Sequence, residues 1–195
     1  MHTGIIWIRN ALRLNDNRVL VESLNSTNSQ NILPLYILNE SGLKQKNNDN
    51  RIKFLYESLI DLDSRFKAKL GTNLVILNGS SEDIFDKLLN SDLLNISEIF
   101  TDYSNKPDDV KNENSLKQIL TKNTSVKLHL ISKVNSLTNI EEIVNQENFK
   151  PPKTMKDMEK LFSNIYPKDE DGFYSIDEPL DIPRSEEHTS ELQSP

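Results

Sequence analysis

Short apolar runs alternate with amphipathic stripes along the first 130 residues, and this alternation limits the fold more than any other feature. The apolar runs predict buried strands at Gly4–Ile8, Ile32–Leu38, Asn73–Leu77, Ile96–Thr101 and Val126–Ile131. The stripes predict helices at Asp16–Leu24, Arg51–Leu70, Ser81–Asn90 and Pro107–Lys122. Strands that alternate with helices form parallel sheets covered on both faces. We therefore expect an α/β fold with a doubly wound, mainly five-stranded parallel sheet.

Residues with strong positional preferences mark the ends of these helices. Asp16 is predicted to cap the first helix, and Gly71 stands where a left-handed residue ends the second. Ser80, with Asp83 three residues later, matches a capping signature. Pro107 suits a first helical turn, because its missing N–H has no partner there in any case.

The pattern changes after residue 132, which predicts an α/β domain over 1–132 and a linker with short helices over 133–183. One short helix is expected at Leu137–Asn145 and a second after the cap residue Thr154. On the second helix a set of apolar residues shares one face, which predicts core-like packing. The set is Met155, Met158, Leu161, Phe162 and Ile165.

The last twelve residues, 184–195, have no apolar period, and a possible codon spelling of them resembles a common sequencing-adapter oligonucleotide. We expect this segment to be a disordered artefact that marks a reading frame cut within a gene. The alternative is an ordinary acidic tail.

Composition excludes several classes of function. The formal net charge of −7 disfavours a general nucleic-acid surface, which needs clustered Lys and Arg. The chain has no cysteine and only three scattered histidines, so we expect no metal site. No apolar run approaches the length of a membrane span, and the N-terminus shows no secretory leader. We expect a nuclear or cytoplasmic protein without membrane partners.

The stretch Ile5–Asn17, with the sequence IIWIRNALRLNDN, resembles the opening motif W-F-R-x-D-L-R-x-x-D-N of the photolyase/cryptochrome family. Asn10 and Ala11 depart from it at the positions between the two arginines. Further blocks resemble family motifs in the correct order, and together they cover about residues 4–165. These blocks are Arg51–Asp63, Leu70–Gly79, Phe100–Asp108 and Ser136–Thr154.

The resemblance implies the Rossmann-like N-terminal α/β domain of a blue-light flavoprotein. In the family a C-terminal helical domain, which this chain lacks, holds FAD and carries the photochemistry. The α/β domain acts as a scaffold and in some members holds an antenna, either a folate, a deazaflavin or FMN. The parent protein would be a cryptochrome photoreceptor, with signalling or circadian partners, or a photolyase that binds damaged DNA. A parent enzyme would be a deoxyribodipyrimidine or (6-4) photolyase, whereas this fragment is expected to be inactive and not to bind FAD tightly.

The resemblance also implies cofactor-binding residues near the ends of the strands, namely Arg9, Ile37, Leu38, Arg51 and Tyr103, and no catalytic residue in this fragment. Arg9 is open between a hydrogen bond to the chromophore and an ion pair with Asp16 or the acidic linker. Tyr103 is open between stacking on a ring and covering the sheet edge.

Other prominent side chains favour structural roles. Arg13 is expected to form an ion pair that fixes its loop. Trp7 lies in a strand and is expected to pack in the core, and His129 is expected to be a hydrogen-bonded core histidine.

Two other functions stay open on the sequence. One is a free-standing nucleotide-binding α/β protein of the universal-stress or electron-transfer-flavoprotein type, which needs a glycine-rich phosphate loop that the sequence lacks. The other is an acidic interaction module.

Overall fold

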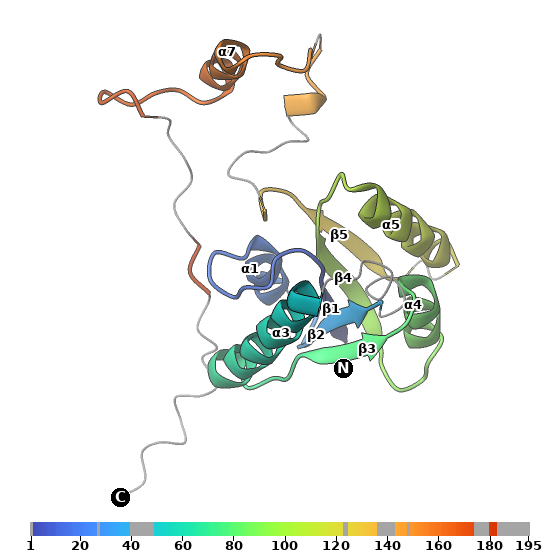
Figure 1. Cartoon of the computed structure of the whole chain (residues 1–195). Helices are drawn as coiled ribbons and strands as arrows, with labels where there is room; N and C mark the ends of the chain where they lie inside the picture. The colour runs from blue at the N-terminus through green and yellow to red at the C-terminus, as the bar shows by residue number, and fades with distance from the viewer. Residues whose placement is uncertain are drawn as a thin grey trace, which may run out of the picture.

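A parallel five-stranded sheet forms the centre of the protein in the computed structural model, which describes residues 2–26, 28–39, 49–122, 125–135, 143–147, 149–173 and 180–182. The strand order is β3-β2-β1-β4-β5 (Figure 1). The strands are β1 (Thr3–Ile8), β2 (Asn31–Leu38), β3 (Val75–Asn78), β4 (Ile96–Asp102) and β5 (Lys127–Ile131). The predicted fold class is confirmed, and each predicted strand lies within two residues of its observed bounds at both ends.

Helices cover both faces of the sheet because the central strand is apolar on both sides. All six residues of β1 are buried. Ile6 and Ile8 pack with α1 (Arg18–Asn25) and α3 (Asp49–Leu70), whereas Ile5 and Trp7 pack with α4 (Ser81–Leu89) and α5 (Pro107–Leu120). Trp7 is 3% exposed and meets Phe85 edge to face at 4.9 Å between ring centroids, so its predicted core role is confirmed.

The winding of the sheet reverses between β1 and β4. From β1 the chain moves outward to β2 and β3, and then crosses back to β4 and β5 on the other side. The register pairs Trp7 with Thr101, so the carboxyl ends of β1 and β4 lie next to each other. Ligands in open α/β sheets bind at such a reversal, beyond the carboxyl ends of the strands.

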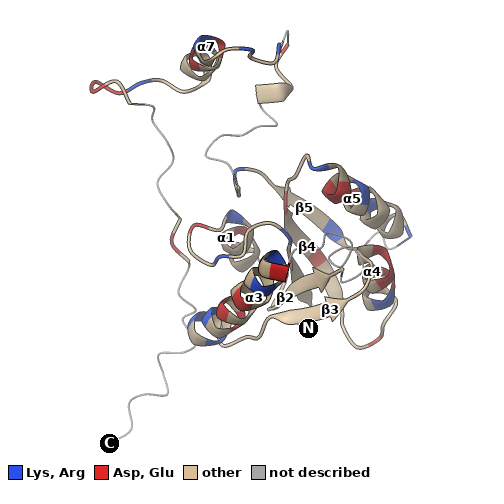
Figure 2. Cartoon of the chain, viewed as in Figure 1, with Lys and Arg blue, Asp and Glu red and all other residues tan. Residues whose placement is uncertain are grey.

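The solvent side of α3 carries alternating charges (Figure 2). Ion pairs one turn apart join Lys53 to Glu57 at 3.8 Å, Asp61 to Arg65 at 2.8 Å and Asp63 to Lys67 at 2.7 Å. Such exposed pairs add only a few tenths of a kcal/mol each. The helix is therefore held mainly by its apolar face, where Leu59, Leu62 and Phe66 are buried.

The cap predicted for the first helix is one residue wrong. Asn17 is the N-cap of α1, and its Oδ1 accepts hydrogen bonds from the N–H groups of Val19 at 3.1 Å and Leu20 at 3.4 Å. Asp16 instead adopts φ +50°, a left-handed conformation that Asp and Asn tolerate better than most residues. The predicted caps Gly71, with φ +64°, and Ser80, which accepts from the Asp83 N–H at 3.1 Å, are confirmed.

Replacing Asn17 with alanine is expected to lower the free energy of unfolding by about 1 kcal/mol, because two buried N–H groups of α1 lose their acceptor. Asp16→Asn keeps a residue suited to positive φ and is the control, with an expected change below about 0.5 kcal/mol. Urea unfolding of both variants measures the difference. A larger loss in Asp16→Asn would contradict the assignment of the cap.

The linker helix α7 (Met155–Ile165) begins at Thr154 as predicted, with a capping box between Thr154 and Asp157. Its apolar face is not packed in a core, so that prediction is wrong. No residue of α7 is buried, and Met155 is 83% exposed. Most of the predicted helix Leu137–Asn145 and the segment 184–195 lie outside the described residues. Among the helices that are described, none combines the length and apolarity that crossing a bilayer needs.

Candidate functional site at the carboxyl edge of the sheet

A buried ion pair occupies the point where the winding reverses. Arg9 follows β1 and Asp102 ends β4, and their side chains are only 6% and 3% exposed. Arg9 Nε donates to Asp102 Oδ1 at 3.2 Å, and Arg9 Nη2 donates to the Asp102 carbonyl oxygen. The guanidinium carbon also lies 4.8 Å from the centre of the Trp7 ring, so that the cation lies over an aromatic face. These contacts fix the carboxyl ends of β1 and β4 to each other.

Amides extend this pair into a network. Asn10 Nδ2 donates to Asp102 Oδ2 and to Asp109 Oδ2, both at 2.9 Å, and Asn135 Nδ2 donates to Asp102 Oδ2 at 3.1 Å. Lys106 Nζ donates to Asn10 Oδ1 at 2.6 Å. Because Asn10 departs from the family motif, this amide bridge between two carboxylates is a feature of the present chain that the resemblance does not predict.

Asp109, in the first turn of α5, is held in its charged form. Burial alone would raise the pKa of Asp109. Hydrogen bonds from Ser104 Oγ at 2.6 Å and Asn10, together with the charges of Arg9 and Lys106, outweigh burial and lower that pKa. Asp109 therefore brings a negative charge to the site at neutral pH.

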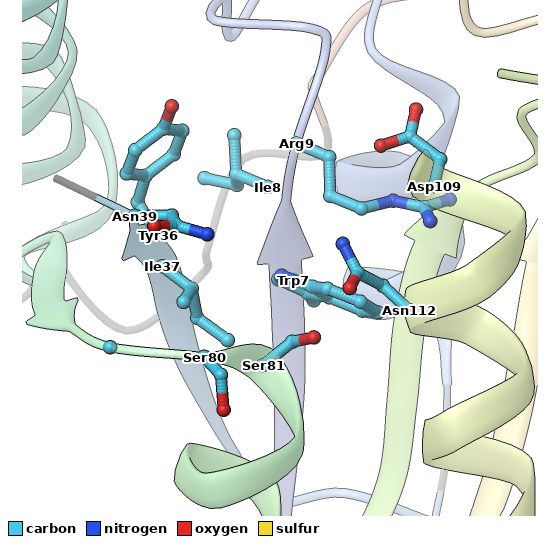
Figure 3. A pocket seen from close by; sticks show the side chains of 11 residues that line it. Trp7, Ile8, Arg9, Tyr36, Ile37, Asn39, Ser80, Ser81, Asp109 and Asn112 are labelled. Carbon is cyan, nitrogen blue, oxygen red and sulfur yellow. The ribbon is translucent and has the colours of Figure 1, made fainter. Parts of the chain in front are cut away.

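The ion pair leaves one donor of Arg9 unused. Nη1 of Arg9 is the single buried side-chain nitrogen or oxygen without a hydrogen-bond partner among the described residues. Arg9 also lines a cavity of about 200 Å³ that opens beyond the ends of β1 and β2 (Figure 3). The other lining residues are Trp7, Ile8, Tyr36, Ile37, Asn39, Gly79, Ser80, Ser81, Asp109 and Asn112. A buried N–H without an acceptor costs free energy, so a ligand oxygen that reached Nη1 from the cavity would be a favourable partner for it.

The structure brings together only some of the residues predicted to bind a cofactor. Arg9 and Ile37 line the cavity. Leu38 is 5% exposed in the core, Arg51 is exposed on α3, and Tyr103 is half-buried with its N–H donating to the Ile131 carbonyl at 2.8 Å. These three residues are not among the described residues that line the cavity.

Sequence reasoning missed Asp102, Asp109, Asn112 and the start of α4. The signal was their position, since Asp102 is the last residue of β4 and the others lie in the first turns of the next helix at the carboxyl edge. For Arg13 the structural prediction is confirmed. It lies 3.7 Å from Asp16 Oδ2, and its Nη2 donates to the Val134 carbonyl at 2.7 Å.

A second polar cluster lies at the opposite, amino edge of the sheet. Glu98 of β4 is 1% exposed and accepts from Ser26 Oγ at 2.6 Å, Asn28 Nδ2 at 3.2 Å and Ser29 Oγ at 3.0 Å. His129 Nε2 lies 3.0 Å from Glu98 Oε1, which confirms its predicted hydrogen bond. Its side chain is 36% exposed, however, so His129 is not a core residue. In the described part of the chain, no three His, Cys, Asp or Glu side chains gather as a metal site would require.

Comparison with known proteins places the chain in a family. Residues 4–171 match the family model described as DNA photolyase. The chain belongs to the DNA photolyase family. The chain is 28% identical over 165 residues to two relatives, cryptochrome-1 of Spalax judaei and cryptochrome-1 of Mus musculus. The matches cover 84% of this chain but 27% and 26% of those relatives, so the chain spans about a quarter of their length.

Solved structures support the same fold for this member of the DNA photolyase family. A cryptochrome of Synechocystis matches 94% of the chain and 36% of its own length, at 20% identity and a TM-score of 0.74. An archaeal photolyase of Sulfolobus tokodaii matches 66% of the chain and 29% of its own length, at 20% identity and a TM-score of 0.53. That photolyase is described as holding two FAD molecules, with the implication of a novel light-harvesting cofactor.

Proposed function

We propose that this chain is the antenna and scaffold domain of a blue-light flavoprotein, with the cavity beside Arg9 as the antenna site. One observation carries the proposal, namely that Arg9, whose buried Nη1 has no hydrogen-bond partner, lines a cavity beyond the carboxyl ends of β1 and β2. Family membership supports it, and the light-harvesting cofactor named for the Sulfolobus photolyase gives a precedent.

The residues of the cavity fit a planar heterocycle. A ring carbonyl would accept from Arg9 Nη1, Ile37 offers an apolar side wall, and Trp7 forms part of the floor. At about 200 Å³ the cavity is smaller than the 300–1,000 Å³ typical of sites for drug-sized ligands. It therefore suits the ring system of a folate, a deazaflavin or FMN rather than a whole dinucleotide.

The proposal also covers the longer parent protein that would contain this domain. In our proposal it holds FAD in a C-terminal helical domain, which packs against the present α/β domain. The parent then acts either as a cryptochrome with signalling partners or as a photolyase on damaged DNA. The match to only about a quarter of each cryptochrome supports a longer parent.

Binding of a ring system without a charged tail tests the antenna site. We expect pterin or riboflavin to quench the fluorescence of Trp7, the only tryptophan, with a Kd on the order of 1 mM or tighter. Asn112→Phe fills the cavity wall and should weaken binding at least about tenfold. Asn114→Phe, an exposed position on the same helix that does not line the cavity, is the matched control. Absence of quenching by both rings, or equal quenching in Asn112→Phe, would contradict the antenna site.

A further inference from the structure

The cavity beside Arg9 offers hydrogen-bond donors without offering a net positive charge. Arg9 and Asp109 are its two charged lining residues in the described part of the chain, and their charges cancel. Behind the wall, Asp102 Oδ1 lies 3.2 Å from Arg9 Nε and adds a second carboxylate, so the one cation of the lining has two acidic neighbours. An arginine in a ligand pocket ordinarily indicates a phosphate or carboxylate partner, but here the positive charge is already paired.

The helix N-termini beside the cavity also carry acidic residues in their first turns. Helix α4 begins at Ser81 in the wall, and its first turn carries Glu82 and Asp83. The side chain of Ser80 accepts from the Asp83 N–H and its hydroxyl donates to Asp83 Oδ2 at 2.7 Å. Helix α5 likewise carries Asp108 and Asp109 in its first turn. Acidic residues in the first turn interact favourably with the helix dipole, and this reduces the attraction of these N-termini for an anionic ligand.

The remaining titratable groups do not reverse this balance. Lys106 adds one positive charge near Asp109, but its Nζ donates to Asn10 and lies outside the lining. Tyr36 in the wall stays a neutral phenol, because burial raises the pKa of its hydroxyl. Among the described residues the lining of the site is therefore neutral overall, and the first turns of α4 and α5 beside it carry acidic residues.

We infer that this cavity selects a ligand that is uncharged where it meets Arg9, a neutral heterocycle with a ring carbonyl, and rejects one that brings a phosphate or carboxylate there. The inference rests on the proposed antenna site and names the chemistry of its ligand. Asp109 is the residue that sets the selectivity, since its side chain lies next to the guanidinium of Arg9 and both residues line the cavity (Figure 3). In this arrangement Arg9 recognises the dipole of a ring carbonyl, because its positive charge is already balanced by Asp102 and Asp109.

Pterin and pterin-6-carboxylate test the inference, because they share one ring system and differ by one carboxylate. Both are small enough that the charge cannot lie far from Asp109. Titrated into the full chain at low salt with Trp7 fluorescence as the readout, pterin is expected to bind about tenfold more tightly. The preference should shrink as ionic strength rises, because salt screens the repulsion at this solvent-open site.

Two variants test whether the charge of Asp109 causes the preference for pterin. Asp109→Asn keeps an oxygen that accepts from Asn10 and Ser104 but loses the charge, and it should reduce the preference to about twofold. Asp108→Asn removes a charge from the neighbouring exposed position and should leave the preference nearly unchanged. Equal or tighter binding of pterin-6-carboxylate by the wild-type chain overturns the inference while the antenna site stands. If neither pterin nor riboflavin binds, the antenna site and the inference are overturned together.

Discussion

Asp102→Ala is expected to lower the free energy of unfolding by about 3–5 kcal/mol, a large share of the 5–15 kcal/mol that holds a typical domain together. The variant leaves the Arg9 guanidinium buried without its counterion, and Asn10 and Asn135 lose a shared acceptor. Urea unfolding followed by circular dichroism measures the loss. Asp92→Ala, at an exposed position of the α4–β4 connection, is the control and should change stability by less than about 0.5 kcal/mol.

A double variant separates the buried charge from the contact itself. Replacing both partners, as Arg9→Met with Asp102→Leu, removes the unpaired charge and should cost less than the two single changes added together. Asp102→Asn retains one carbonyl acceptor and should lose about 2 kcal/mol, which keeps the test usable if Asp102→Ala does not fold. A loss below about 1 kcal/mol in Asp102→Ala would show that the ion pair does not hold β1 against β4.

The fold could be predicted from sequence because the sheet is buried on both faces. A strand such as β1, with six buried residues in a row, appears in the sequence as an unbroken apolar run, and the helices between strands carry a clear stripe. The α7 prediction failed because periodicity shows that a helix has an apolar face but not what covers it. The cap predicted for α1 was wrong for another reason. Asp and Asn are both good N-cap residues, and only the positive φ of Asp16 shows that Asn17 is the cap.

The candidate site was only partly predictable, because its central contact joins residues that are 93 positions apart. Arg9 was visible as a cation after a buried strand, but its partner depended on β4 lying next to β1. The sequence suggested local or linker partners for Arg9, and the structure shows Asp102 instead. The charge balance of the cavity could not be predicted either. Its lining comes from two strands, two helices and the segments between them, which meet only in the folded protein.

Glu98→Gln is expected to cost about 2–3 kcal/mol, because a buried carboxylate with four hydrogen-bonding neighbours becomes a neutral amide. The neighbours are Ser26, Asn28, Ser29 and His129, so the carboxylate joins the connection after α1 to both β4 and β5. In the variant, the amide nitrogen replaces one of the two carboxylate oxygens and faces hydrogen-bond donors there, which weakens the connection between these segments. Glu22→Gln, the same change on an exposed position of α1, should shift the unfolding free energy by less than about 0.5 kcal/mol.

The cost of Glu98→Gln should also depend on pH in a defined direction. Burial alone would raise the pKa of Glu98, but the hydrogen bonds from Ser26, Asn28, Ser29 and His129 lower it below the ordinary value of 4.5. A carboxyl whose pKa is lower in the folded state contributes its full stabilisation above the unfolded value and loses it as the pH falls through the folded value. The difference in unfolding free energy between wild type and Glu98→Gln should therefore be largest at neutral pH and shrink below pH 4.5. A difference that stays constant from pH 7 to pH 3 would mean that the charge of Glu98 contributes nothing, and that its shape and packing alone fix the amino edge of the sheet.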